Sequence, residues 1–74
     1  MDNLDLKNLR NTLGVTQVDF AERLKISTVY VKKLESGSVP ITSEIMERIY
    51  LLIVRDFPSL GWFAGTFAEI EKIL

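Results

Sequence analysis

Apolar residues recur at helical spacing along most of the chain. Leu6, Leu9 and Leu13 stand three and four residues apart, which is the spacing of one face of a short amphipathic helix. Gly14 follows at the place where the end of a helix favours a left-handed residue. The pattern therefore predicts a first helix that stops at Gly14.

A second helix is predicted to begin after Thr16, whose hydroxyl suits an N-cap. Asp19, three residues later, places a carboxylate in the first turn, where the helix dipole favours negative charge. The residues expected to form the apolar face of this helix are Val18, Phe20, Ala21 and Leu24.

A third helix is predicted over residues 28–36, separated from the second by only residues 25–27. Ser27 suits its N-cap and Gly37 its C-terminal end. Two short helices joined by such a tight turn cross steeply, so the second helix can project from the domain while the first supports it.

A fourth helix is predicted after the loop at residues 36–40, with Thr42 or Ser43 as its cap. It should end at residues 56–58, because proline disfavours helix in the residue before it. Its apolar positions are Ile45, Met46, Ile49, Leu52 and Ile53.

The last part of the chain, residues 59–74, is predicted to hold one or two short helices. Thr66 with Glu69 has the spacing of a capping box. No segment alternates as a β-strand would. The expected fold is an all-α bundle of five or six short helices, with a domain over residues 1–64 and a helical extension over residues 65–74.

Composition supports a single small domain and argues against an enzyme. The chain has 74 residues and is 47% hydrophobic, which is enough to form a hydrophobic core. A chain this short buries only a modest fraction of its surface, and small domains commonly gain further burial by dimerising. It has no cysteine and no histidine, so thiolate metal sites, disulfides and the usual neutral-pH base are absent. No nucleophile with a base and no phosphate-binding loop is apparent, so we expect neither catalysis nor a cofactor.

Targeting features are also missing from the sequence. Met1 is followed by acidic and polar residues, unlike a signal peptide, and the longest apolar stretch, residues 49–54, is too short to span a bilayer. We therefore expect a protein of the cytoplasm with no membrane partner.

Charge is unevenly distributed along the chain. The net charge is −1, but residues 7–33 carry six basic and two acidic side chains. Residues 34–74 carry three basic and six acidic side chains. This distribution suits a basic surface for nucleic acid on the first half, although charge alone is equally compatible with an ordinary solvated surface.

The predicted third helix has the two faces that a DNA-reading helix needs. Val31 and Leu34 share the inner face. The major groove admits an α-helix, lysine can donate to guanine O6 and N7, and a valine or threonine methyl can pack on a thymine methyl. The side chains left for the outer face are Thr28, Val29, Lys32 and Lys33. Considered without the rest of the motif, the two lysines would also suit an ordinary solvated face.

The segment from Gly14 to Pro40 holds an ordered string of residues at fixed spacing: Gly14-Val15-Thr16-Gln17, Ala21-Glu22-Arg23-Leu24, Ser27, Val31, Lys33, Leu34, Glu35, Gly37 and Pro40. This string resembles the phage repressor and Cro family of helix-turn-helix proteins. The similarity spans roughly residues 6–63 and implies a DNA-binding regulator of the λ-repressor-like fold.

The resemblance implies particular roles for residues of this chain. Gln17 matches a phosphate-contacting position, and Arg10 and Glu35 match a partly buried structural ion pair. Thr28, Val29, Lys32 and Lys33 match positions that face bases. Two roles are compatible with Tyr30: a phosphate contact, or packing against the first helix. The further backbone contacts expected are Thr16, Lys25, Ser27 and Ser38.

This chain also departs from the family pattern. The family often has glycine where Lys25 stands, so lysine there needs either a left-handed backbone or an altered turn. Val29 and Tyr30 replace the short polar residues usual at the start of the reading helix, so base preference cannot be transferred. The segment from Gly65 onward extends past the similarity.

Members of the family commonly dimerise through their last helices, which implies a homodimer on a palindromic operator with recognition helices about 34 Å apart. Trp62 and Phe63 could instead be core residues. The expected interface residues are Trp62, Phe63, Phe67, Ile70 and Leu74.

The resemblance implies a phage, prophage or mobile element as the setting, in the cytoplasm of a bacterium or a phage-infected cell, although restriction-modification controllers and antitoxins share the same fold and length. Repression is favoured over activation, because so small a domain has little surface for recruiting polymerase. The alternative, suited by the overall acidity and the apolar C-terminal segment, is a helix-turn-helix module that binds and modulates a second regulator protein.

Overall fold

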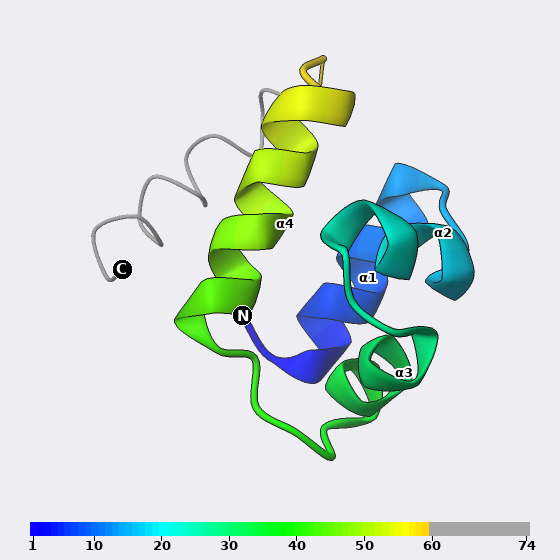
Figure 1. Cartoon of the computed structure of the whole chain (residues 1–74), viewed down its shortest axis with the longest axis vertical. Coiled ribbons are helices and arrows are strands. Elements are labelled where there is room, and N and C mark those ends of the chain that lie inside the picture. The colour runs from blue at the N-terminus through cyan, green and yellow to red at the C-terminus, as the bar shows by residue number, and fades with distance from the viewer. Residues whose placement is uncertain (60–74) are drawn as a thin grey trace. The chain divides into compact units, whose positions relative to one another are not determined.

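The computed structural model describes residues 1–59, and this part of the chain is all helical. It contains α1 (Asn3–Leu13), α2 (Gln17–Leu24), α3 (Thr28–Ser36) and α4 (Ser43–Asp56), with no strand among the described residues (Figure 1). The chain divides into two compact units, Met1–Ile41 and Thr42–Leu74. The fifth and sixth helices expected in residues 59–74 fall essentially outside the described residues.

Each helix begins at a side chain that accepts a backbone hydrogen bond from three residues further on, which satisfies one of the free N–H groups of the first turn. The predicted caps Thr16 and Ser27 are confirmed, and Thr42 is the cap of α4. At α1, Asp2 accepts from the Asp5 N–H at 2.8 Å and Asp5 accepts from the Asp2 N–H at 3.2 Å. This reciprocal capping box was not expected from the sequence.

Three of the helices end at a left-handed residue. Gly14 (φ 74°) ends α1 and Gly37 (φ 83°) ends α3, as predicted. Lys25 (φ 60°) ends α2 and is the one non-glycine residue with positive φ among those described. Of the two alternatives for Lys25, the chain adopts the left-handed backbone, at a steric cost of about 1–2 kcal/mol for a residue with a Cβ.

In the unit Met1–Ile41, α3 packs against both α1 and α2. Phe20, Val31 and Leu34 are fully buried. Val18 is 56% exposed, so the expectation that it belongs to the apolar face of α2 is wrong. The buried apolar residues of this unit are Leu6, Leu9, Leu13, Phe20, Ala21, Leu24, Val31 and Leu34.

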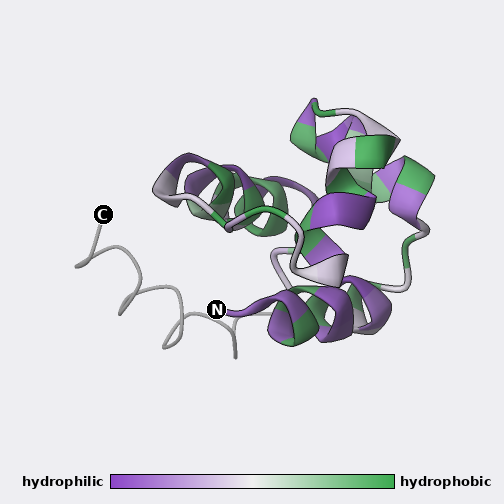
Figure 2. Ribbon diagram, turned by 90° about the horizontal axis from the view of Figure 1, so that it is seen from below, coloured by the Kyte–Doolittle hydropathy of each residue, from purple (hydrophilic) through white to green (hydrophobic). Residues whose placement is uncertain are grey.

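In the second unit, α4 is amphipathic and ends at Asp56, as predicted from the proline at position 58. Figure 2 shows hydrophilic and hydrophobic residues interleaved along the helices, as expected when one face of each is buried. The five apolar residues predicted for α4 are all buried: Ile45, Met46, Ile49, Leu52 and Ile53.

Two further properties concern residues 1–59 alone. No helix in this range combines the length and the apolar content that a bilayer-spanning segment needs. Nor does this range hold a group of three or more acidic, cysteine or histidine side chains placed to bind a metal ion.

Candidate nucleic-acid interface

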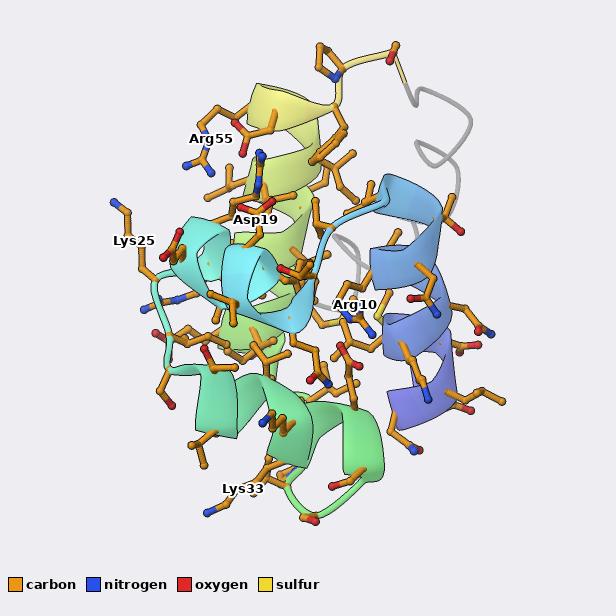
Figure 3. The ribbon with its side chains drawn as sticks, turned by 90° about the vertical axis from the view of Figure 1, so that its right-hand side faces the viewer. Arg10, Asp19, Lys25, Lys33 and Arg55 are labelled. Atoms are coloured by element: carbon orange, nitrogen blue, oxygen red, sulfur yellow. The ribbon has the colours of Figure 1, made fainter. Side chains whose placement is uncertain are left out.

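The candidate interface is built on α3, which has one buried and one exposed face. Val31 and Leu34 are completely buried in the first unit. Val29 is 61% exposed and Lys32 and Lys33 are exposed. Figure 3 shows the Lys33 side chain extending away from the helices. The division into an inner and an outer face is therefore the one that the spacing of these residues predicts.

The exposed face of α3 carries positive charge only. Lys32 and Lys33 are the basic residues of α3, and Glu35 is the single acidic residue of the helix. The Glu35 side chain is only 4% exposed and is turned toward Arg10. Because the one carboxylate of the helix is buried in an ion pair, it does not offset the two lysines where an anionic ligand would approach.

The Arg10–Glu35 ion pair links α1 to α3. Arg10 Nε donates to Glu35 Oε2 at 2.7 Å, and Arg10 Nη2 donates to Glu35 Oε1 at 3.2 Å. Arg10 Nη1 also donates to the Val15 carbonyl at 3.0 Å, and the Arg10 side chain is 13% exposed. The planar guanidinium thus holds both carboxylate oxygens and a loop carbonyl at once, a geometry that lysine does not offer.

Gln17, at the start of α2, joins the same network. Its Nε2 donates to Glu35 Oε1 at 3.2 Å. The amide group retains a second hydrogen and an acceptor oxygen, so it is held in place and can still make further hydrogen bonds. One carboxylate therefore ties α3 to residues of both α1 and α2. Sequence reasoning assigned Gln17 to a phosphate contact and missed this bond, for which a separation of 18 residues gives no local signal.

Asn3 adds a further contact that the sequence did not indicate. Its Nδ2 donates to the Glu35 backbone carbonyl at 3.1 Å, near the end of α3. The same side chain lies 3.4 Å from where a Cβ would stand on Gly37. The first turn of α1 thus packs closely on the last turn of α3, and glycine at position 37 serves both the left-handed backbone and this approach.

The turn between α2 and α3 presents a third lysine. Lys25 is exposed, and Figure 3 shows its side chain directed outward from the turn. Ser27, two residues later, accepts from the Tyr30 N–H at 3.0 Å. Thr16 accepts from the Asp19 N–H at 3.1 Å in the same way. Each of these two hydroxyls still has its own hydrogen to donate.

The remaining residues of the predicted interface are less uniform in their placement. Thr28 and Tyr30 are partly exposed at the start of α3. Ser38 is exposed just beyond the helix, with its hydroxyl 2.8 Å from that of Ser36. The residues predicted for the dimer interface, Trp62, Phe63, Phe67, Ile70 and Leu74, lie outside the described residues.

The model of the helix-turn-helix family matches residues 6–49, a range that begins inside α1, includes all of α2 and α3, and ends halfway along α4. Searches among curated proteins and among solved structures gave no match.

Proposed function

The chain belongs to the helix-turn-helix family of the repressor and Cro type, whose members are DNA-binding transcription regulators, and from this we propose that it is a repressor that inserts α3 into the major groove of an operator. The observation that carries the proposal is the exposed face of α3. It offers two lysines and an apolar side chain, while the only carboxylate of the helix is held inward by Arg10.

Base reading is assigned to the outer side chains near the start and middle of α3. Lys32 and Lys33 suit the O6 and N7 acceptors of guanine, and the methyl groups of Thr28 and Val29 suit apolar contact. These contacts distinguish one sequence from another, whereas contacts to phosphates only orient the protein on the duplex.

Phosphate contacts are assigned to the hydrogen-bond donors around this helix. The caps Thr16 and Ser27 have hydroxyl hydrogens to donate, and Gln17 has a second amide hydrogen. Because Glu35 holds the Gln17 amide, that donor would be oriented before DNA arrives, which lowers the entropy lost on binding. The other members of this set are Lys25, Tyr30 and Ser38.

We propose that the active form is a homodimer on a palindromic operator, with its two α3 helices about one DNA turn, or 34 Å, apart. Trp62, Phe63, Phe67, Ile70 and Leu74 are the interface residues that this proposal assigns. Sedimentation of the full chain should show a dimer at tens of micromolar, and a monomer there would contradict the assignment. A phage, prophage or mobile element is the proposed setting.

The decisive experiment is binding of the full chain to the DNA upstream of its own gene at two salt concentrations, with random duplex as competitor. Small repressors often control their own promoters, so this fragment is the first target to try. We expect tight binding that survives the competitor and falls steeply with salt, because each neutralised phosphate adds about 0.9 to the logarithmic slope. Binding that random DNA abolishes would contradict sequence-specific regulation and favour a module that acts on a second regulator.

A further inference from the structure

Val29 is a residue that the fold does not require. It is the second residue of α3 and is 61% exposed, so it adds little to the core. A β-branched side chain is also a poorer helix former than alanine on an exposed helix surface. Neither packing nor helix propensity therefore accounts for valine at this position.

The surroundings of Val29 are those of the proposed reading face. Lys32 and Lys33 stand three and four residues further on, so all three side chains share the exposed side of the helix. A valine neither donates nor accepts a hydrogen bond. In the major groove, the feature that an apolar side chain can select is the C5-methyl group of thymine.

We propose that Val29 reads a pyrimidine C5-methyl group in each half of the operator. This inference rests on the proposed DNA-binding function and makes it more specific. Cytosine methylated at C5 presents a methyl group at the same place as thymine. The consequence is that cytosine methylation at this one position of a half-site raises the affinity of the protein for DNA, so the operator is sensitive to methylation state.

The size of the effect follows from the area of one methyl group. Removing one buried methyl from contact with Val29 costs the transfer free energy of about one CH₂ unit, which corresponds to roughly a four-fold weaker Kd. If both halves of a palindrome are altered together, the factors multiply to about fifteen-fold.

The test begins with DNA that the full chain selects from a random duplex library. Each thymine of the selected sequence is then replaced by deoxyuridine, which lacks only the C5-methyl, and Kd is measured for every single replacement. We expect one position in each half-site to lose about four-fold with the unmodified protein. The same replacement should have no effect on the Val29→Ala variant.

Two controls separate methyl reading from changes in the fold. Val29→Ala should leave thermal stability unchanged or slightly raised, because alanine favours the helix. Val18→Ala is the matched control, because Val18 is the second residue of α2, is 56% exposed and lies off the reading helix. That variant should keep the full sensitivity to deoxyuridine.

A second arm distinguishes thymine from methylated cytosine as the source of the methyl group. The responsive thymine pair is replaced by a cytosine pair, with and without the C5-methyl. We expect methylation to strengthen binding about four-fold for the unmodified protein and not for Val29→Ala. Strengthening that persists in Val29→Ala, or none in either protein, would overturn the methylation sensitivity.

The possible failures are distinguishable. If the library yields a selected sequence but no thymine responds to deoxyuridine, or if Val29→Ala responds as strongly as the unmodified protein, methyl reading by Val29 is overturned and sequence-specific DNA binding stands. If the library yields no selected sequence at all, the proposed function itself fails.

Discussion

Replacing Arg10 with methionine tests the network that holds α3 in place. Methionine keeps an unbranched stem of similar length but removes the guanidinium. The variant loses the two hydrogen bonds to Glu35, at 2.7 and 3.2 Å, and the one to the Val15 carbonyl at 3.0 Å. Glu35, with a side chain only 4% exposed, then keeps the hydrogen bond that its carboxylate accepts from Gln17 Nε2.

The expected cost of Arg10→Met is about 3–5 kcal/mol in the free energy of unfolding, because one member of a buried pair is left as an uncompensated charge. A domain of this length has a total stability of about 4–11 kcal/mol. The melting temperature should fall by at least about 12 °C, since 1 kcal/mol is worth about 4–8 °C in so small a domain.

Urea unfolding followed by circular dichroism measures this cost directly, and two further variants serve as comparisons. Arg23→Met is the matched control: Arg23 pairs with Asp19 at 3.0 Å, but both side chains are more than a third exposed, so the expected cost is below about 1 kcal/mol. The double variant Arg10→Met with Glu35→Met should recover most of the loss, because apolar residues replace a buried pair at little cost. If Arg10→Met costs no more than Arg23→Met, or if the double variant is no more stable than Arg10→Met, the buried ion pair does not hold α3 in place as described.

Three further predictions concern single positions. Lys25→Gly should stabilise the fold by about 0.5–1 kcal/mol, since the left-handed cost of 1–2 kcal/mol exceeds the added chain entropy of glycine; urea unfolding at or below the original midpoint would contradict this. Ser27→Ala should destabilise by about 1 kcal/mol through loss of the α3 cap, with the exposed and non-capping Ser43→Ala expected to change little in the same assay. Lys33→Ala should weaken operator binding by about 1–3 kcal/mol in a competition assay while leaving binding to random duplex nearly unchanged, and equal losses on both DNAs would exclude base reading. Lys7→Ala, an exposed lysine of α1, is its control and should affect neither DNA.

Helix ends are the part of this fold that the sequence predicts best. The caps Thr16 and Ser27 and the left-handed Gly14 and Gly37 depend on hydrogen bonds that span only a few residues, so local sequence contains the information. The cap at Asp2 was missed because its partner at the third position is aspartate, and not the glutamate or glutamine of the usual box.

Burial on the short helices is predicted less well. Val18 is apolar and falls in the helical pattern of α2, yet it is 56% exposed. A helix of eight residues makes little more than two turns, so its periodicity rests on very few positions. Which of them is buried depends on how α2 meets its neighbours, and that is set by tertiary packing.

The long-range polar contacts of the candidate site lie beyond local reasoning. Arg10 and Glu35 were expected as a pair only through the family resemblance, since 25 residues separate them. Gln17 and Asn3 also reach Glu35, at separations of 18 and 32 residues, and neither bond was expected. Such contacts follow from the packed arrangement of α1, α2 and α3, which periodicity and capping do not specify.

The dependence of α3 on α1 has a consequence for protein engineering. At nine residues α3 is shorter than the roughly 12–15 that an isolated helix needs in water, and its first four residues are poor helix formers. A synthetic peptide covering residues 14–37 would lack Arg10 and Asn3, and with them the side chains of α1 that bind Glu35 and its carbonyl. The pair α2 and α3 is therefore not expected to fold when moved alone to another protein, and a graft onto another scaffold must include α1.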